Sequence, residues 1–354
     1  MNGQLMVEVG MRALELGVPL SAHFDLTWRC NERCVHCYLD HDDHGEVTTA
    51  EVKDILDQLA AAGTFFLILS GGEPVMRKDF FEIVEYARQL MFSVKVKTNG
   101  ILIGEREAAR LRELAVEVVQ ISVYSHRSEV HDAITKAPGS LQRTLRAIRF
   151  LRDQGLKVII AGVMMRQNMS DYKEVQRMAE ELGVTFQLDP TITPKLDGDT
   201  SILDLRIPNT MLPELFRDAT LVDDVDEFCA TAEVDTSALE ALPCSAGHTA
   251  CYISPYADVF PCVQFPLPTG NLRRQKFLDI WRGSPQMQEV RGIRVSDLHT
   301  CTSCGNVASC SRCPGLAYME GDMRGPSAAD CDKSFARTGI LSPRKQQQLV
   351  QIAD

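Results

Sequence analysis

The chain has 354 residues, of which 45% are hydrophobic and 24% are charged. This composition is that of an ordinary globular protein and excludes a chain that is mainly disordered or fibrous. The 48 acidic residues exceed the 37 basic ones, a formal net charge of −11, which argues against a nucleic acid or an anionic membrane as the main partner because both attract basic surfaces.

The first 20 residues form a lead segment without a secretory signal, because Glu8, Arg12 and Glu15 interrupt its apolar residues. The longest uninterrupted apolar stretch, Val158–Met165, is far shorter than the about 18 residues that cross a bilayer. We therefore expect a cytoplasmic protein. In that reducing compartment, clustered thiols ligate metal more often than they form disulfides.

Residues 21–190 alternate between short apolar runs and longer amphipathic runs. The apolar runs predict six strands, at residues 22–28, 65–69, 93–97, 118–123, 157–164 and 185–188. The amphipathic runs predict five helices, at residues 49–62, 79–90, 105–114, 141–154 and 171–182. Such alternation implies parallel strands joined by right-handed crossovers. Because six units are fewer than the eight of a closed barrel, we predict an α/β fold with a partial (β/α)6 barrel, and a doubly wound sheet is the alternative.

The rest of the chain divides into three segments. Residues 191–243 are rich in proline and aspartate and predict a linker with one or two helices. Residues 244–341 are rich in cysteine, glycine and proline with little regular pattern, which is typical of a small domain that metal holds together. Residues 342–354 form a polar tail.

Three cysteines directly follow the first predicted strand: Cys30, Cys34 and Cys37. On a loop, three thiolates can converge on one metal centre and leave one of its positions open for another ligand. The alternative is a structural zinc site in which His36 or His41 supplies the fourth ligand.

Further polar groups follow the other predicted strands. The residues after the second strand are Gly71, Gly72, Glu73 and Pro74. The glycines let a small ligand approach the backbone, and the glutamate offers a carboxylate to an ammonium group. Asn99 follows the third strand and Ser122 ends the fourth. The carboxyl ends of parallel strands share one edge of a sheet, where βα folds build their active sites.

The two motifs, Cys-x3-Cys-x2-Cys and Gly-Gly-Glu-Pro, together resemble the radical S-adenosylmethionine (radical SAM) superfamily. The resemblance implies a 4Fe–4S cluster on Cys30, Cys34 and Cys37, with an open iron that chelates the amino and carboxylate groups of S-adenosylmethionine (AdoMet). An electron from the cluster then cleaves AdoMet into methionine and a 5′-deoxyadenosyl radical.

The resemblance also assigns residues to the AdoMet molecule itself. It implies that His36 lies beside the adenine and that residues 71–74 hold the methionine ammonium. Asn99 and Ser122 match positions that contact the ribose or the carboxylate.

Eight cysteines lie in the C-terminal segment: Cys244, Cys251, Cys262, Cys301, Cys304, Cys310, Cys313 and Cys331. Eight thiols supply two complete shells of four, as two 4Fe–4S clusters require. A zinc ribbon on the four cysteines of residues 301–313 is the alternative, but only five residues separate its two pairs, where ribbons have ~12–20.

This segment resembles the SPASM domain, the auxiliary-cluster extension of radical SAM enzymes that modify peptides. The chain departs from the pattern at Ala257, which replaces a glycine, and in the shorter spacing between Cys310 and Cys313, which leaves the assignment of Cys313 open. By analogy, the first auxiliary cluster takes Cys244, Cys251, Cys262 and Cys313. The second takes Cys301, Cys304, Cys310 and Cys331.

Other polar residues have ordinary explanations. Cys229 has no clustered partner and is expected to be a buried or surface thiol. Asp40–His44 could bind a divalent metal, but a solvated loop is favoured. Tyr124, His126 and His131 follow the fourth strand, and the sequence identifies none of them as a general base.

We predict a radical SAM oxidoreductase of the peptide-maturase type, which abstracts hydrogen from a ribosomally made peptide while auxiliary clusters relay electrons. The runner-up is a radical step on a non-peptide metabolite such as a tetrapyrrole. A non-catalytic iron–sulfur carrier is the alternative of another class, and the open three-cysteine site argues against it. Expected partners are the precursor peptide and a reductase such as flavodoxin or ferredoxin. We also expect a separate leader-binding protein, because the residues before Cys30 are too few for an independent peptide-binding domain.

Overall fold

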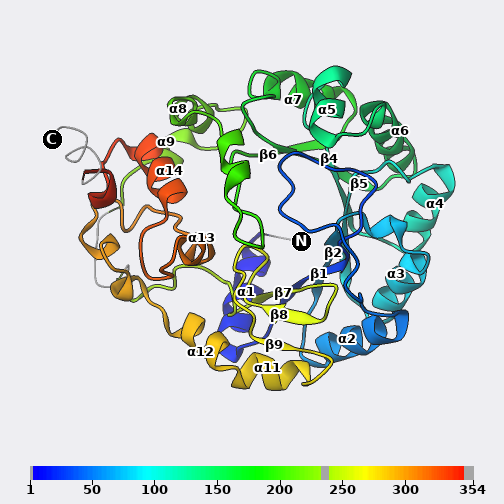
Figure 1. Cartoon of the computed structure of the whole chain (residues 1–354), viewed down its shortest axis with the longest axis horizontal. Helices are drawn as coiled ribbons and strands as arrows, with labels where there is room; N and C mark the ends of the chain where they lie inside the picture. Colours follow the sequence, from blue (N-terminus) through cyan, green and yellow to red (C-terminus); the bar gives the residue numbers. More distant parts are fainter. Residues whose placement is uncertain (1–2, 233–238, 347–354) are drawn as a thin grey trace. The chain divides into compact units, whose positions relative to one another are not determined.

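A computed structural model describes residues 3–232 and 239–346 (Figure 1). The chain forms two compact units. The first comprises Met1–Arg206, Ala246–Val263 and Leu267–Gln288, and the second comprises Ile207–Ser245, Gln264–Pro266 and Glu289–Asp354. The domain boundaries expected above, including 21–190 for the barrel and 244–341 for SPASM, stay predictions.

The first unit contains a sheet with the strand order β6-β5-β4-β3-β2-β1-β7-β8-β9. Its first six strands are β1 (Ser21–Thr27), β2 (Phe66–Gly71), β3 (Ser93–Thr98), β4 (Val118–Ser122), β5 (Lys157–Val163) and β6 (Thr185–Asp189). Each of these six is parallel to its neighbours among them. Because the described strands end at β6 on one edge and β9 on the other, the sheet is open, and the predicted partial α/β barrel is confirmed.

Helices connect the parallel strands, and Figure 1 shows them around the outside of the curved sheet. They are α2 (Thr49–Ala61), α3 (Phe80–Gln89), α4 (Glu105–Glu113), α5 (Ser128–Thr135), α6 (Ser140–Asp153) and α7 (Tyr172–Glu181). The short helix α5 has no counterpart among the sequence predictions. A separate helix, α1 (Gly3–Leu16), precedes the first strand. No helix within residues 3–232 and 239–346 is long and apolar enough to cross a membrane.

Three further strands also escaped prediction. β7 (Ala250–Ile253) pairs in parallel with β1, and β8 (Asp258–Phe260) and β9 (Gly270–Asn271) follow it in antiparallel pairing. The weak sequence pattern after residue 244 therefore did not reveal these strands. Strands of two to four residues are too short to show the alternation from which a strand is predicted.

Alternation along the strands separates two faces of the sheet. The face that packs against the helices is apolar and includes Phe24 and Leu26 on β1 and Val94 and Val96 on β3. Side chains at the alternate positions, such as Lys95 and Lys97, lie on the opposite, inner face.

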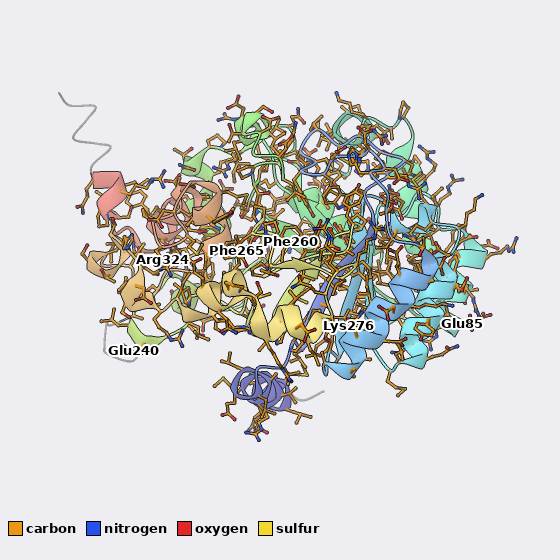
Figure 2. The ribbon with its side chains drawn as sticks, turned by 60° about the horizontal axis from the view of Figure 1, so that its bottom comes forward. Glu85, Glu240, Phe260, Phe265, Lys276 and Arg324 are labelled. Carbon is orange, nitrogen blue, oxygen red and sulfur yellow. The ribbon has the colours of Figure 1, made fainter. Side chains whose placement is uncertain are left out.

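The helix α11 (Phe277–Gly283) packs beside α2 within the first unit. The Phe277 backbone N–H donates to the Gln58 Oε1 at 2.7 Å. Lys276, labelled in Figure 2, places its Nζ 3.8 Å from an Asp54 carboxylate oxygen. The next helix, α12 (Pro285–Gly292), continues the chain from the first unit into the second.

The second unit is built from loops and short helices. These helices are α8 (Leu212–Phe216), α9 (Val225–Cys229), α13 (Pro314–Met319) and α14 (Ala328–Thr338). The Arg217 Nη1 donates to the Ala336 carbonyl at 2.9 Å, and the Arg337 guanidinium lies 4.2 Å from the centre of the Phe228 ring. Part of the predicted linker thus packs against α14.

Candidate functional site

Cys30, Cys34 and Cys37 lie on the loop between β1 and α2, which we call the cysteine loop. All three are half-buried. The Cys37 backbone N–H donates to the Cys34 carbonyl at 3.0 Å, and the Cys30 Sγ accepts from the Glu32 backbone N–H at 3.4 Å. Burial raises the pKa of the Cys30 thiol to about 12 and also raises the pKa of the other two thiols. Thiolates here therefore need a compensating positive charge, which an iron centre supplies.

Gly71 and Gly72 bring the end of β2 against the start of the cysteine loop. The Gly72 N–H donates to the Thr27 carbonyl at 2.8 Å, and the Glu73 N–H donates to the Arg29 carbonyl at 2.9 Å. A Cβ on Gly71 would lie 2.0 Å from the Thr27 oxygen, and one on Gly72 would lie 2.4 Å from the Arg29 oxygen. These glycines therefore permit a close approach between two segments of the chain's own backbone, whereas the sequence analysis expected the approach of a ligand.

Replacing Gly72 with alanine is expected to lower the free energy of unfolding by about 1–3 kcal/mol, because the new Cβ forces the backbone of the cysteine loop to move. Iron bound per chain should fall with it. Thermal unfolding and iron analysis measure both effects. Gly283→Ala is the matched control, because a Cβ there meets nothing within 4 Å. If Gly72→Ala and Gly283→Ala unfold alike and bind iron alike, the packing argument fails.

Glu73 is fully buried, and its carboxylate ties β2 to the end of β3. The Thr98 hydroxyl lies 2.8 Å from both carboxylate oxygens, and the Asn99 backbone N–H donates to one of them at 2.8 Å. The Val75 N–H donates at 3.1 Å, in the 3-10 turn that begins at Pro74. Burial raises the pKa of Glu73 to about 7, and these hydrogen bonds act in the opposite direction. This bracing role was not predicted from the sequence, and the binding of the methionine ammonium by residues 71–74 stays a prediction.

Asn99 connects the end of β3 to the cysteine loop. Its side-chain amide donates to the Asn31 Oδ1 at 2.6 Å and lies 3.8 Å from the Cys30 Sγ. Its Oδ1 accepts from the Ile101 backbone N–H at 3.0 Å. Hydrogen bonds thus join the ends of β1, β2 and β3 into one rim around the cysteine loop. Contact between Asn99 and AdoMet stays a prediction.

An aromatic group lies beside the same loop. The His36 ring meets Tyr124 edge-on at 4.8 Å between centroids, and Tyr124 stacks on His131 at 5.5 Å. Burial lowers the pKa of both histidines to about 4, so both rings are neutral near pH 7. Ser122, at the end of β4, hydrogen-bonds to the Tyr124 side chain, and His126 is exposed. The rim thus brings together His36, Ser122 and Tyr124, while their contacts with AdoMet stay predictions.

The alternatives considered from the sequence have other partners. The His41 Nδ1 lies 3.2 Å from the Trp28 carbonyl oxygen. Asp40 and His44 face each other at 2.6 Å on the exposed part of the cysteine loop. The Cys229 thiol donates to the Phe216 carbonyl at 3.6 Å, between α9 and α8.

The inner face of the sheet carries a polar cluster that the sequence analysis missed. Asp25 is fully buried, and its Oδ2 accepts from the Tyr252 hydroxyl at 2.8 Å and from the Trp28 indole at 3.2 Å. The His23 Nε2 lies 3.2 Å from the other Asp25 oxygen. Burial lowers the pKa of the Lys97 ammonium, and the charge of Asp25 opposes this change. Strands of parallel sheets are usually apolar on both faces. The polar residues at alternate positions of β1 and β3 were therefore the sequence signal for this polar cluster.

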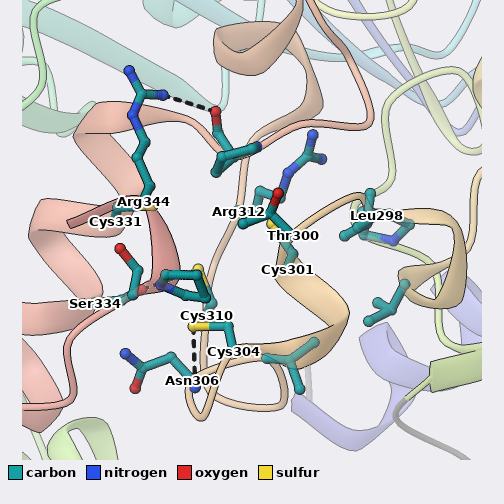
Figure 3. Close-up of a pocket in the computed structure, with 16 residues that line it drawn as sticks. Leu298, Thr300, Cys301, Cys304, Asn306, Cys310, Arg312, Cys331, Ser334 and Arg344 are labelled. Atoms are coloured by element: carbon teal, nitrogen blue, oxygen red, sulfur yellow. Dashed lines mark hydrogen bonds between the residues drawn. The ribbon is translucent and has the colours of Figure 1, made fainter. Parts of the chain in front are cut away.

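Four cysteines line one pocket of the second unit (Figure 3): Cys301, Cys304, Cys310 and Cys331. The pocket encloses about 570 Å³ of empty space, part of which is open to solvent. The Cys310 Sγ accepts from the Ser334 hydroxyl at 3.0 Å, and the Cys304 Sγ accepts from the Asn306 backbone N–H at 3.5 Å. Four thiols with hydrogen bonds to sulfur fit a 4Fe–4S cluster. These are the ligands proposed above for the second auxiliary cluster, and their proximity supports that proposal.

The ligands proposed for the first auxiliary cluster are divided between the two units. Cys251, on β7, and Cys262 belong to the first unit, whereas Cys244 and Cys313 belong to the second. Cys313 directly precedes α13, and its backbone N–H donates to the Asp330 carboxylate at 2.8 Å. The assignment of these four cysteines to one cluster stays a prediction.

Comparisons with known proteins match two regions of the chain to known families. The Radical SAM superfamily model matches residues 26–179, and the SPASM iron–sulfur cluster-binding domain model matches residues 244–314. The AdoMet-dependent heme synthase of Methanosarcina barkeri is 30% identical over 85% of this chain and 92% of that protein. The mycofactocin maturase MftC of Mycobacterium tuberculosis is 32% identical over 93% of this chain and 87% of that protein.

Solved structures share the fold. SuiB of Streptococcus suis bound to the precursor peptide SuiA has a TM-score of 0.72 at 19% identity and covers 94% of this chain and 81% of its own. The enzyme anSMEcpe with bound AdoMet has a TM-score of 0.68 at 17% identity, with coverages of 94% and 100%. Fold and site define an enzyme that uses AdoMet and iron–sulfur clusters. The chain belongs to the radical SAM superfamily and carries a SPASM domain.

Proposed function

We propose that the chain removes a hydrogen atom from a peptide by means of a 5′-deoxyadenosyl radical, and that auxiliary clusters accept the electron left on the product. One observation carries the proposal: a loop with three half-buried cysteines coexists with a C-terminal pocket lined by four cysteines. The 32% identity to a mycofactocin maturase over 93% of the chain supports a maturase. A structure of the same fold is bound to a precursor peptide, which is consistent with a peptide substrate.

In this mechanism, Cys30, Cys34 and Cys37 would hold the first cluster, which supplies the electron that cleaves AdoMet. The chain's own residues shape the place of reaction. Asn99 fixes the cysteine loop through Asn31. The neutral His36 ring and the buried Tyr124 form an apolar wall that excludes water from a reactive radical.

The inner face of the barrel would hold the substrate. Asp25 is fully buried and fixed by Tyr252 and Trp28, and its charge favours the charged form of Lys97. Lys97 offers an ammonium group to a substrate carbonyl or carboxylate. The substrate then loses one hydrogen atom to the radical and one electron and one proton afterwards, which leaves it oxidised by two electrons.

A second candidate is radical modification of a tetrapyrrole. It is favoured by the 30% identity to an AdoMet-dependent heme synthase over 85% of the chain. Lys97 suits the carboxylates of a tetrapyrrole as well as those of a peptide. The inner face alone therefore does not separate the two substrates.

The proposal includes two protein partners. A reductase of the flavodoxin or ferredoxin type supplies the first electron. A separate leader-binding protein presents the peptide, since a chain with a net charge of −11 is poorly suited to bind an acidic leader by itself.

The function is tested by anaerobic assays with the precursor peptide encoded beside the gene. We expect 5′-deoxyadenosine and a peptide two hydrogens lighter, with binding that tightens when an adjacent small leader-binding protein is added. Mass spectrometry and a binding titration measure these results. Tight binding of the precursor peptide to the chain alone would overturn the proposal that a partner protein delivers it. Turnover of an iron-coproporphyrin, with no change in any nearby peptide, would overturn the peptide substrate in favour of the second candidate.

A further inference from the structure

The pocket lined by four cysteines also contains two guanidinium groups. Arg312 and Arg344 both line it, and Figure 3 shows Arg312 beside Cys301. Two positive charges therefore lie in the wall of this pocket.

The two arginines differ in how their charge is balanced. The Arg344 Nη1 pairs with the Glu320 carboxylate at 2.5 Å. Arg312 has no carboxylate partner among residues 3–232 and 239–346, and it is only 6% exposed. Its guanidinium is the uncompensated charge of the pocket.

Backbone carbonyls hold the Arg312 guanidinium in place. The Nε donates to the Gly325 carbonyl at 2.8 Å, and the Nη2 donates to the carbonyls of Gly325 and Met323. The Nη1 is buried and has no hydrogen-bond partner in the described part of the chain. A buried charged donor without a partner is unfavourable, so this nitrogen needs an acceptor that the described protein atoms do not provide.

A 4Fe–4S cluster with four thiolate ligands provides such an acceptor. The cluster and its thiolates carry net negative charge, and reduction adds another negative charge. Fixed positive charge and hydrogen bonds to sulfur therefore stabilise the reduced form and raise the reduction potential.

We propose that Arg312 is a positioning residue for the second auxiliary cluster: its Nη1 donates a hydrogen bond to a cluster sulfur, and its charge raises the potential of that cluster. The inference rests on the proposed ligand set of Cys301, Cys304, Cys310 and Cys331. It gives this cluster the role of an electron acceptor in the proposed function. Arg344 contributes less because Glu320 neutralises it.

The test is a redox titration monitored by electron paramagnetic resonance on anaerobically reconstituted full-length protein. The background variant lacks Cys30, Cys34 and Cys37, so that only auxiliary clusters are observed. Arg312→Gln removes the charge but keeps an amide donor. It is expected to lower the equilibrium constant for reduction of one cluster at least tenfold, which is a shift of about 59 mV to lower potential. Arg312→Lys, which keeps the charge, should restore most of the potential.

The matched control is Arg324→Gln, because Arg324 lies in the same unit but pairs with Glu289 and does not line the pocket (Figure 2). Its potentials should equal those of the background variant. Full iron loading with unchanged potentials in Arg312→Gln would overturn the inference. If Arg312→Gln fails to retain iron, Arg312→Lys decides: loss of the cluster there too would assign Arg312 a merely structural role. None of these measurements uses a substrate, so failure of the peptide assay leaves the inference intact.

Discussion

Replacing Cys30, Cys34 and Cys37 together with alanine is expected to abolish AdoMet cleavage and to lower the iron content from about 12 to about 8 atoms per chain. Without these three thiolates, no open iron site remains to chelate AdoMet. The eight C-terminal cysteines still hold two auxiliary clusters, so most of the iron stays. Iron analysis and chromatographic detection of 5′-deoxyadenosine measure the two effects on the same preparation.

Cys229→Ala is the control for this experiment, because that thiol bonds to the Phe216 carbonyl and belongs to none of the proposed ligand sets. It should keep all the iron and full cleavage activity. Stoichiometric zinc in place of iron at the C-terminal sites would contradict the ligand assignment. AdoMet cleavage that survives loss of the three cysteines would contradict the role of the cysteine loop.

Replacing Cys304 with alanine is expected to reduce modified product to the detection limit while AdoMet cleavage continues. Cys304 accepts a hydrogen bond from Asn306 and lines the second-unit pocket, so its loss disrupts a cluster there without touching the AdoMet site of the first unit. The product radical then has no electron acceptor. The ratio of 5′-deoxyadenosine to product measures this uncoupling.

The neighbouring Ser303→Ala supplies the control, because Ser303 is exposed and its hydroxyl donates only to the Thr300 carbonyl. It should leave the ratio unchanged. Product formed by Cys304→Ala at the normal yield would show that this cluster is dispensable. Spectroscopic detection of substrate bound to an auxiliary iron would contradict the electron-transfer role itself.

The barrel was predictable because the sequence patterns of its strands and helices are long and involve residues close together in the chain. Each of the first six strands alternates with a helix of eight or more residues, and buried residues such as Val94 and Val96 recur at every second position. The short strands β7, β8 and β9 carry too few residues for any period to appear. Their place in the sheet comes from the pairing of β7 with β1, which is a contact between residues more than 200 positions apart, and β8 and β9 then follow β7.

The motifs of the site were also predictable, but their internal contacts were not. The spacing of the cysteines identified the loop, and the sequence Gly-Gly-Glu-Pro identified the rim. That Glu73 braces Thr98, and that a buried nitrogen of the pocket-lining Arg312 has no partner in the described part of the chain, depends on which loops meet in space and on side-chain rotamers. Neither is encoded in a local pattern. The polar residues on β1 could have been noticed, because His23 and Asp25 alternate with buried apolar ones.

The hydrogen bonds that join Gly72, Glu73 and Asn99 to the start of the cysteine loop involve no metal. The loop therefore loses conformational entropy when the protein folds and not when iron arrives. Cellular machinery that delivers iron and sulfide meets a cysteine loop whose start is already held in place by the ends of β2 and β3. Oxygen damages a cluster with one open iron more readily than a fully ligated cluster. Because the loop keeps its shape, a lost cluster can be rebuilt on it without refolding the barrel.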